Sequence, residues 1–223
     1  MKKAKISEVF KSIQGEGIYA GLVQIFIRFF GCNLNCSFCD TRLSEYVQMS
    51  CNQLLERISF FGKDTSWVSI TGGEPLLQVE CLKEFFPLLK NKGYNIYLET
   101  NGTLPDNLSP LIGYIDVVSM DFKLPSSTGC GNYFDVHRRF LEISRAKDVF
   151  VKMVITPDTS EDDLEEAVSI IHNISPHIPV VLQPVHPLEE LLKEKVGYFK
   201  YRVEEYLRNV RIVPQLHKVT GVK

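Results

Sequence analysis

The stretch Gly31-Cys-Asn-Leu-Asn-Cys-Ser-Phe-Cys-Asp-Thr41 follows directly on the apolar run Leu22–Phe30, which has the composition of a β-strand. It places Cys32, Cys36 and Cys39 within eight positions, and the two asparagines between the first two cysteines favour turns over regular structure. Thiolates are soft ligands that suit zinc or an iron-sulfur cluster. The sequence therefore predicts a metal-binding loop at the carboxyl end of a strand.

The number of cysteines in this loop distinguishes a structural zinc site from an iron-sulfur cluster. Structural zinc takes four protein ligands, and the sequence has no second CxxC or HxxxH pair to supply the fourth. A four-iron cluster held by three cysteines leaves one iron open to a ligand that is not protein. A cluster that binds a reactive cofactor is therefore favoured, and a zinc site with a distant fourth ligand is the alternative.

Length and composition indicate one globular domain, residues 1–223, with 44% hydrophobic residues and a net charge of -2. This charge argues against direct nucleic-acid binding through phosphate neutralisation. The basic start Met1–Lys5 is followed by polar residues and not by an apolar run, and no apolar stretch is long enough to span a bilayer. We expect a cytoplasmic enzyme with reduced thiols, in which Cys51, Cys81 and Cys130 are buried or incidental.

Six short apolar runs alternate with helical patterns along the chain. The expected strands are Leu22–Phe30, Trp67–Thr71, Ile96–Thr100, Ile115–Asp121, Val149–Thr156 and Pro179–Gln183. The expected helices cover residues 50–61, with Ser50 as N-cap, and 80–92, 135–145, 160–173 and 188–209.

This alternation is typical of βα units around a parallel sheet. Eight such units typically need about 250 residues, so the chain is short for a closed barrel. We predict an α/β fold, a partial, open (β/α) barrel of about six parallel strands with an N-terminal hairpin extension. Polar residues gather after several strands, where parallel α/β folds place their sites: Gly72-Gly-Glu-Pro75, Glu99-Thr-Asn101, Asp121-Phe-Lys123 and Gln183-Pro-Val-His186.

The CxxxCxxC spacing with Phe38 before its last cysteine, followed by Gly72–Pro75, resembles the radical S-adenosylmethionine superfamily. Three further segments resemble the 7-carboxy-7-deazaguanine synthase family, over nearly the whole chain: Phe10–Gly17, Cys39–Thr41 and Gln215–Lys218. The resemblance implies radical ring contraction of 6-carboxy-5,6,7,8-tetrahydropterin to 7-carboxy-7-deazaguanine with release of ammonia. This is a lyase step toward queuosine- and archaeosine-type deazapurines. An electron from the cluster would cleave S-adenosylmethionine, and the resulting 5′-deoxyadenosyl radical would take hydrogen from C6 of the pterin.

The resemblance also implies three cofactors, a [4Fe-4S] cluster, S-adenosylmethionine and Mg2+, and a role for named residues. The implied metal ligands are Cys32, Cys36 and Cys39 for the cluster and Thr41 for Mg2+. The implied cofactor-binding residues are Phe38, Cys39, Asp40, Gly73, Asp121, Lys123 and Gln183. The implied substrate-binding residues are Ile13, Gln14, Gly15, Glu16, Arg28 and Thr71. No catalytic side chain is expected, because the cofactor radical carries the chemistry.

For several of these residues the side-chain chemistry supports a binding role independently of the resemblance. Glycines 72 and 73 lack Cβ atoms and would let a ligand approach the backbone, although a glycine pair after a strand is often only a tight turn. Gln14 and Glu16 offer both donors and acceptors for an amino-pyrimidinone edge. Arg28, a charge within an apolar strand, needs a partner such as a carboxylate, unless it faces solvent. Thr41 could equally cap the following segment.

The expected partners follow from the resemblance: a small carboxypterin, a one-electron donor such as flavodoxin or ferredoxin, and a second copy in a homodimer. Two other functions stay open, a glycyl-radical enzyme activase and a non-enzymatic zinc-binding module. His137, His172 and His177 are expected at the surface or in packing. His217 lies in the tail segment that, in the family, closes over the substrate.

Overall fold

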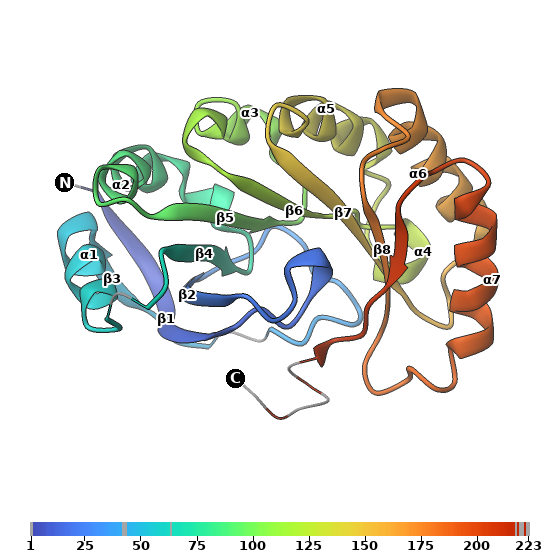
Figure 1. Ribbon diagram of the computed structural model, residues 1–223, viewed down its shortest axis with the longest axis horizontal. Coiled ribbons are helices and arrows are strands. Elements are labelled where there is room, and N and C mark those ends of the chain that lie inside the picture. Colours follow the sequence, from blue (N-terminus) through green and yellow to red (C-terminus); the bar gives the residue numbers. More distant parts are fainter. Residues whose placement is uncertain (1, 42–43, 63, 217, 219–220, 222–223) are drawn as a thin grey trace.

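The computed structural model describes residues 2–41, 44–62, 64–216, 218 and 221. Within them the chain forms one sheet of nine strands in the order β3-β1-β2-β4-β5-β6-β7-β8-β9, with α2, α3, α5 and α6 arranged along one side (Figure 1). The strands are β1 Lys3–Ile13, β2 Val23–Phe29, β3 Val47–Ser50, β4 Trp67–Gly72, β5 Asn95–Thr100, β6 Val117–Asp121, β7 Asp148–Ile155, β8 Val180–Pro184 and β9 Val210–Ile212. The helices are α1 Cys51–Ser59, α2 Val79–Asn91, α3 Pro105–Leu108, α4 Pro125–Thr128, α5 Phe134–Ser144, α6 Glu161–Ile174 and α7 Lys193–Glu204.

The predicted partial, open barrel with an N-terminal hairpin is confirmed. From β2 through β9 each neighbouring pair in the sheet order is parallel, whereas β1 pairs antiparallel with β2 and with β3. Two short strands were not predicted. Strand β3 has four residues and β9 has three. Segments this short carry little sequence pattern of their own, and their conformation is set by pairing, of β3 with β1 and of β9 with β8.

The helices follow the predicted ranges with one exception. Ser50 caps α1 through a capping box with Gln53, and Ser160 caps α6 by accepting from the Asp163 amide. The helix predicted over 188–209 is shorter, because α7 begins at Lys193 and the prolines at 184 and 187 keep the preceding segment in turns. Among the described residues, no helix combines the length and the apolar character needed to cross a bilayer.

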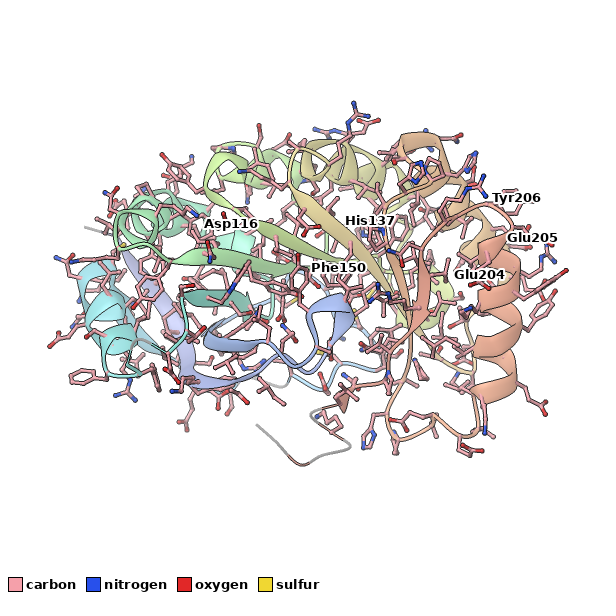
Figure 2. The ribbon with its side chains drawn as sticks, in the orientation of Figure 1. Asp116, His137, Phe150, Glu204, Glu205 and Tyr206 are labelled. Carbon is pink, nitrogen blue, oxygen red and sulfur yellow. The ribbon has the colours of Figure 1, made fainter. Side chains whose placement is uncertain are left out.

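Alternation along the strands gives the sheet two different faces. One face packs against the helices, where each buried side chain such as Phe85 of α2 contributes roughly 1.5–3 kcal/mol. The inner face is apolar at its amino-terminal end, with Phe150 (Figure 2) against the turn Gly17–Tyr19. Two positions further on, the inward residues become polar: Glu99, Ser119, Lys152 and Gln183. The carboxyl end of the partial barrel is therefore lined by hydrogen-bonding groups above an apolar floor.

Candidate active site

A cavity of about 800 Å3 opens at the carboxyl ends of the parallel strands. It is lined by residues from the hairpin, the cysteine loop, six of the parallel strands and the C-terminal segment. Every residue that the sequence predicted for a metal, cofactor or substrate contributes to this lining: Ile13, Gln14, Gly15, Glu16, Arg28, Cys32, Cys36, Phe38, Cys39, Asp40, Thr41, Thr71, Gly73, Asp121, Lys123 and Gln183. The structure brings these residues together, while their individual roles remain predictions.

The three cysteines lie in a loop that is held in place by a hydrogen bond to α4. Ser37 donates its backbone N–H to the carbonyl of Thr128 over 2.8 Å, which fixes the loop against α4. Cys32 and Cys39 are exposed and Cys36 is half-buried. Burial raises the pKa of the Cys36 thiol to about 12, so a metal that binds there must displace a proton. In the described part of the chain no three acidic, histidine or cysteine side chains converge on a single-ion position.

The turn after β4 passes very close to the turn after β2. A Cβ atom on Gly73 would lie 2.2 Å from the Gly31 carbonyl oxygen and 2.9 Å from the Cys32 Cβ, distances that no side chain tolerates. Gly72 has a φ of 139°, and a Cβ there would meet the Phe29 backbone at 2.1 Å. The glycine pair is therefore required to bring its backbone against the cysteine loop.

Glu74, which the sequence analysis named only as part of the segment Gly72–Pro75 and gave no role, connects these strand ends. It is completely buried, and its carboxylate accepts from the backbone amides of Leu76 and Asn101 and from the Thr100 hydroxyl, at 2.7 to 3.0 Å. Burial raises its pKa to about 7, against the opposing effect of these donors. Glu74 thus joins the ends of β4 and β5 behind the cavity wall.

A chain of buried charges crosses the cavity. Lys152 of β7 pairs with Glu16 and lies 3.3 Å from Asp121 Oδ2, which also accepts from Lys123 at 2.8 Å. Lys123 in turn lies over the ring of Phe38 in the cysteine loop, 5.2 Å from its centroid. Burial alone would lower the pKa of Lys152, but the carboxylates of Glu16 and Asp121 raise it above the usual value. The sequence analysis missed Lys152, although a charge in an apolar strand is the signal that selected Arg28.

The loop at residues 13–16, which the sequence predicts to bind substrate and which is called the substrate loop below, uses its side chains for internal contacts. Gln14 is only 4% exposed, and its side-chain amide donates to Glu99 at 2.8 Å. Glu99 also accepts from the Thr71 hydroxyl at 2.7 Å, so the loop is joined to β4 and β5. Arg28 pairs with Glu8 through Nε at 3.0 Å. The loop backbone is also engaged within the protein, because Gln14 bonds to Leu22 and Gly21 through its N–H and carbonyl, and the Gly15 carbonyl accepts from Leu216.

The Asp40–Thr41 pair and the C-terminal segment meet on the far side of the cavity. The Thr41 hydroxyl donates to Asp40 Oδ1 at 3.2 Å, and Asp40 pairs with Lys218 at 3.1 Å. Gln215 donates to Glu16 at 2.7 Å. The tail segment therefore contacts both the substrate loop and the cysteine loop, and His217 lies outside the described residues.

Among the other histidines and cysteines, His186 lines the cavity and Cys130 lies against Cys36. The rest of the described ones lie away from the cavity lining. His137, a residue of α5, is fully buried, while His172 and His177 are at the surface, as expected. Cys51 and Cys81 are buried, also as expected, but they face each other across α1 and α2 with their sulfurs 3.9 Å apart.

Comparison with known proteins places this arrangement in a class. The family model of the radical SAM superfamily matches residues 26–171. The partial barrel and the cysteine loop at its carboxyl end thus define a radical S-adenosylmethionine protein. The structure is also similar to that of QueE from Escherichia coli, with a TM-score of 0.68 and 24% identity over 96% of this chain and 95% of the other.

Relatives of similar length narrow the assignment. The chain is 36% identical to the 7-carboxy-7-deazaguanine synthase of Geobacter sulfurreducens, covering 98% of this chain and 97% of the relative. It is 35% identical to that of Methanopyrus kandleri, covering 96% and 92%. The chain belongs to the 7-carboxy-7-deazaguanine synthase family. Membership over nearly the full length displaces the zinc-module and activase alternatives.

Membership of the superfamily implies a [4Fe-4S] cluster and S-adenosylmethionine, and the residues present fit both groups. The three thiols border the cavity, and cysteine thiolates are the ligands that hold iron-sulfur clusters. Two buried acceptors, Asp121 Oδ1 and Gln183 Oε1, have no hydrogen-bond partner among the described residues. Buried polar atoms are nearly always paired, so these two oxygens point to donors on a ligand.

Proposed function

We propose that this chain converts 6-carboxy-5,6,7,8-tetrahydropterin to 7-carboxy-7-deazaguanine with release of ammonia, a step in deazapurine biosynthesis. The observation that carries the proposal is the shared cavity, in which the loop at residues 13–16 faces the cysteine loop. Its volume of about 800 Å3 lies within the range of cofactor and ligand sites.

The cysteine side of the cavity would hold the cluster and the cofactor. Cys32, Cys36 and Cys39 would ligate three irons, and the backbone at Gly73 would receive the amino group of S-adenosylmethionine. When bound, these groups supply one-electron reduction and a carbon-centred radical that abstracts hydrogen. Phe38, Asp40, Asp121, Lys123 and Gln183 would orient the adenosine and carboxylate parts, as the unpaired oxygens of Asp121 and Gln183 support.

The opposite side would hold the pterin. Ile13, Gln14 and Gly15, which line the cavity, would border the amino-pyrimidinone edge, with Glu16 held in place by Lys152. Thr71 and Arg28 project from β4 and β2 toward the same space. The apolar floor around Phe150 keeps water from the reacting carbon.

Mg2+ would bind between the two ligands, with the Thr41 hydroxyl as its protein ligand and the substrate carboxylate as a second. Magnesium keeps several waters and uses few protein ligands, so waters and substrate oxygens would complete the coordination beside the Thr41 hydroxyl. Its position beside Asp40, at the border of the cysteine loop, supports this placement.

Further features of the proposal rest on length, charge and hydropathy, and on the family resemblance for the homodimer and the electron donor. Residues 1–223 act as one cytoplasmic domain without direct nucleic-acid or membrane contact. The chain works as a homodimer, and a flavodoxin or ferredoxin supplies the electron.

An anaerobic turnover assay tests the proposed function. The reconstituted protein, dithionite, S-adenosylmethionine, Mg2+ and the carboxypterin should yield 7-carboxy-7-deazaguanine and ammonia, followed by mass spectrometry. Cys36→Ala is the matched control and should yield neither. Cleavage of S-adenosylmethionine without ring-contracted product would show that the radical chemistry acts on another substrate.

A further inference from the structure

Asn101, directly after β5, contacts the first cysteine of the cluster loop. Its side-chain amide nitrogen Nδ2 lies 3.9 Å from the Cys32 sulfur, in hydrogen-bonding geometry. Asn101 is 5% exposed. The residue is not among those that the sequence assigned to any ligand.

The orientation of this amide is fixed by its other contacts. The Asn101 side-chain oxygen accepts from the Thr103 backbone amide at 3.0 Å and from the Thr103 hydroxyl at 2.6 Å. The Nδ2 group donates one hydrogen to Asn33 Oδ1 at 2.9 Å, which leaves its second hydrogen for Cys32. A flipped amide would lose both Thr103 contacts and direct an oxygen at the sulfur.

The backbone of Asn101 is equally constrained. Its N–H donates to buried Glu74 at 2.7 Å, and its carbonyl accepts from Nε2 of His137, a buried residue of α5 (Figure 2), at 3.0 Å. Asn101 is thus held on both sides, by Glu74 through its N–H and by His137 through its carbonyl. The Asn101 side-chain amide is therefore oriented toward the Cys32 sulfur without any rearrangement on reduction of the cluster.

We propose that the Asn101 amide donates a hydrogen bond to the Cys32 thiolate and thereby raises the reduction potential of the cluster that Cys32 holds. The oxidised cluster accepts one electron from its donor, no proton moves, and the added negative charge is shared with the thiolates. A hydrogen bond to a more negative acceptor is stronger, so the bond stabilises the reduced state. Leu34 donates a second, backbone bond to the same sulfur at 3.4 Å, which substitution leaves in place.

The test is a redox titration of the anaerobically reconstituted protein, without S-adenosylmethionine or pterin. Dithionite and mediators set the potential, and electron paramagnetic resonance reports the reduced cluster. Asn101→Ala should lower the reduced-to-oxidised ratio at fixed potential by between about threefold and tenfold, tenfold being about 59 mV for one electron. Thr103→Val, which removes one anchor of the amide, should shift the potential in the same direction by less.

Asn107→Ala is the matched control, because Asn107 donates to the Leu76 carbonyl and not to a thiol. It should leave the potential unchanged. A shift below threefold or toward higher potential in Asn101→Ala overturns the proposal, as does a protein that no longer binds iron, since Asn101 would then be needed for assembly. The inference depends on the cluster alone, so its failure leaves the pterin reaction untouched.

Discussion

Replacing Lys152 by methionine removes the cation that joins the substrate loop to the cofactor side of the cavity. The Lys152 side chain is 13% exposed, and its partners Glu16 and Asp121 are 21% and 16% exposed, so two carboxylates would face each other in a poorly solvated space. Removing one partner from a buried ion pair typically costs about 3–5 kcal/mol. At about 2–4 °C per kcal/mol for a chain of this size, Tm should fall by roughly 6–20 °C.

The pKa of Lys152 is raised, so its stabilising charge is present below the ordinary lysine value and is lost only as pH rises through the higher folded value. The loss of stability in Lys152→Met should therefore be constant between about pH 6 and pH 9. Turnover should fall about a hundredfold at temperatures where the variant is folded, because a displacement of about 1 Å in a positioning loop has that effect.

Thermal melts of both proteins across pH, with turnover at low temperature, measure these effects. Lys200→Met is the control: Lys200 pairs with Glu204 at the surface of α7 (Figure 2), where an ion pair contributes about 0–1 kcal/mol. If Lys152→Met melted within 2 °C of the wild type and turned over normally, Lys152 would not hold the loop, and the reasoning would be refuted.

Three further predictions concern the cluster, the magnesium site and the buried acid. Cys36→Ala should lose cluster iron and all cleavage of S-adenosylmethionine, measured by iron analysis and chromatography, whereas Cys51→Ala should retain both; full iron in Cys36→Ala would remove it from the site. Thr41→Ala should lower turnover and lose its Mg2+ dependence at normal iron content, while a capping role predicts about 1 kcal/mol of lost stability with an unchanged Mg2+ response. Burial raises the pKa of Glu74 from 4.5 to about 7, so its protonated form is favoured in the folded protein. The free energy of unfolding of the wild-type protein, measured in denaturant and compared with that of Glu74→Gln, should therefore fall by about 3 kcal/mol as pH rises from 4.5 to about 7. Parallel pH profiles for the two proteins would contradict this prediction.

The sequence predicted those parts of the site whose chemistry lies in short segments. The cysteine loop, the glycine pair and residues 13–16 each combine a spacing with a residue type, and all of them line one cavity. The parallel sheet followed from the repeated alternation of apolar and helical segments, because each strand carries its own pattern.

The residues that were missed act through partners far away in the chain. Lys152 and Glu16 are 136 positions apart, and Glu99 and Gln14 are 85 apart. The spacing of residues within a short motif does not reveal contacts between residues so far apart in the sequence. The sequence signal that could have identified Lys152 and Glu99 is a charged residue within or at the end of an apolar strand. Burying such a charge is costly unless a partner lies near it.

The central claim, that pterin and cofactor meet in one cavity, is tested most directly by isotope transfer. With a substrate deuterated at C6, single-turnover reactions should place deuterium in 5′-deoxyadenosine or S-adenosylmethionine, detected by mass spectrometry, because the pterin carbon faces the radical. Formation of product with no deuterium in either adenosyl species would contradict the account, since the hydrogen would then come from a position that the proposed arrangement does not present.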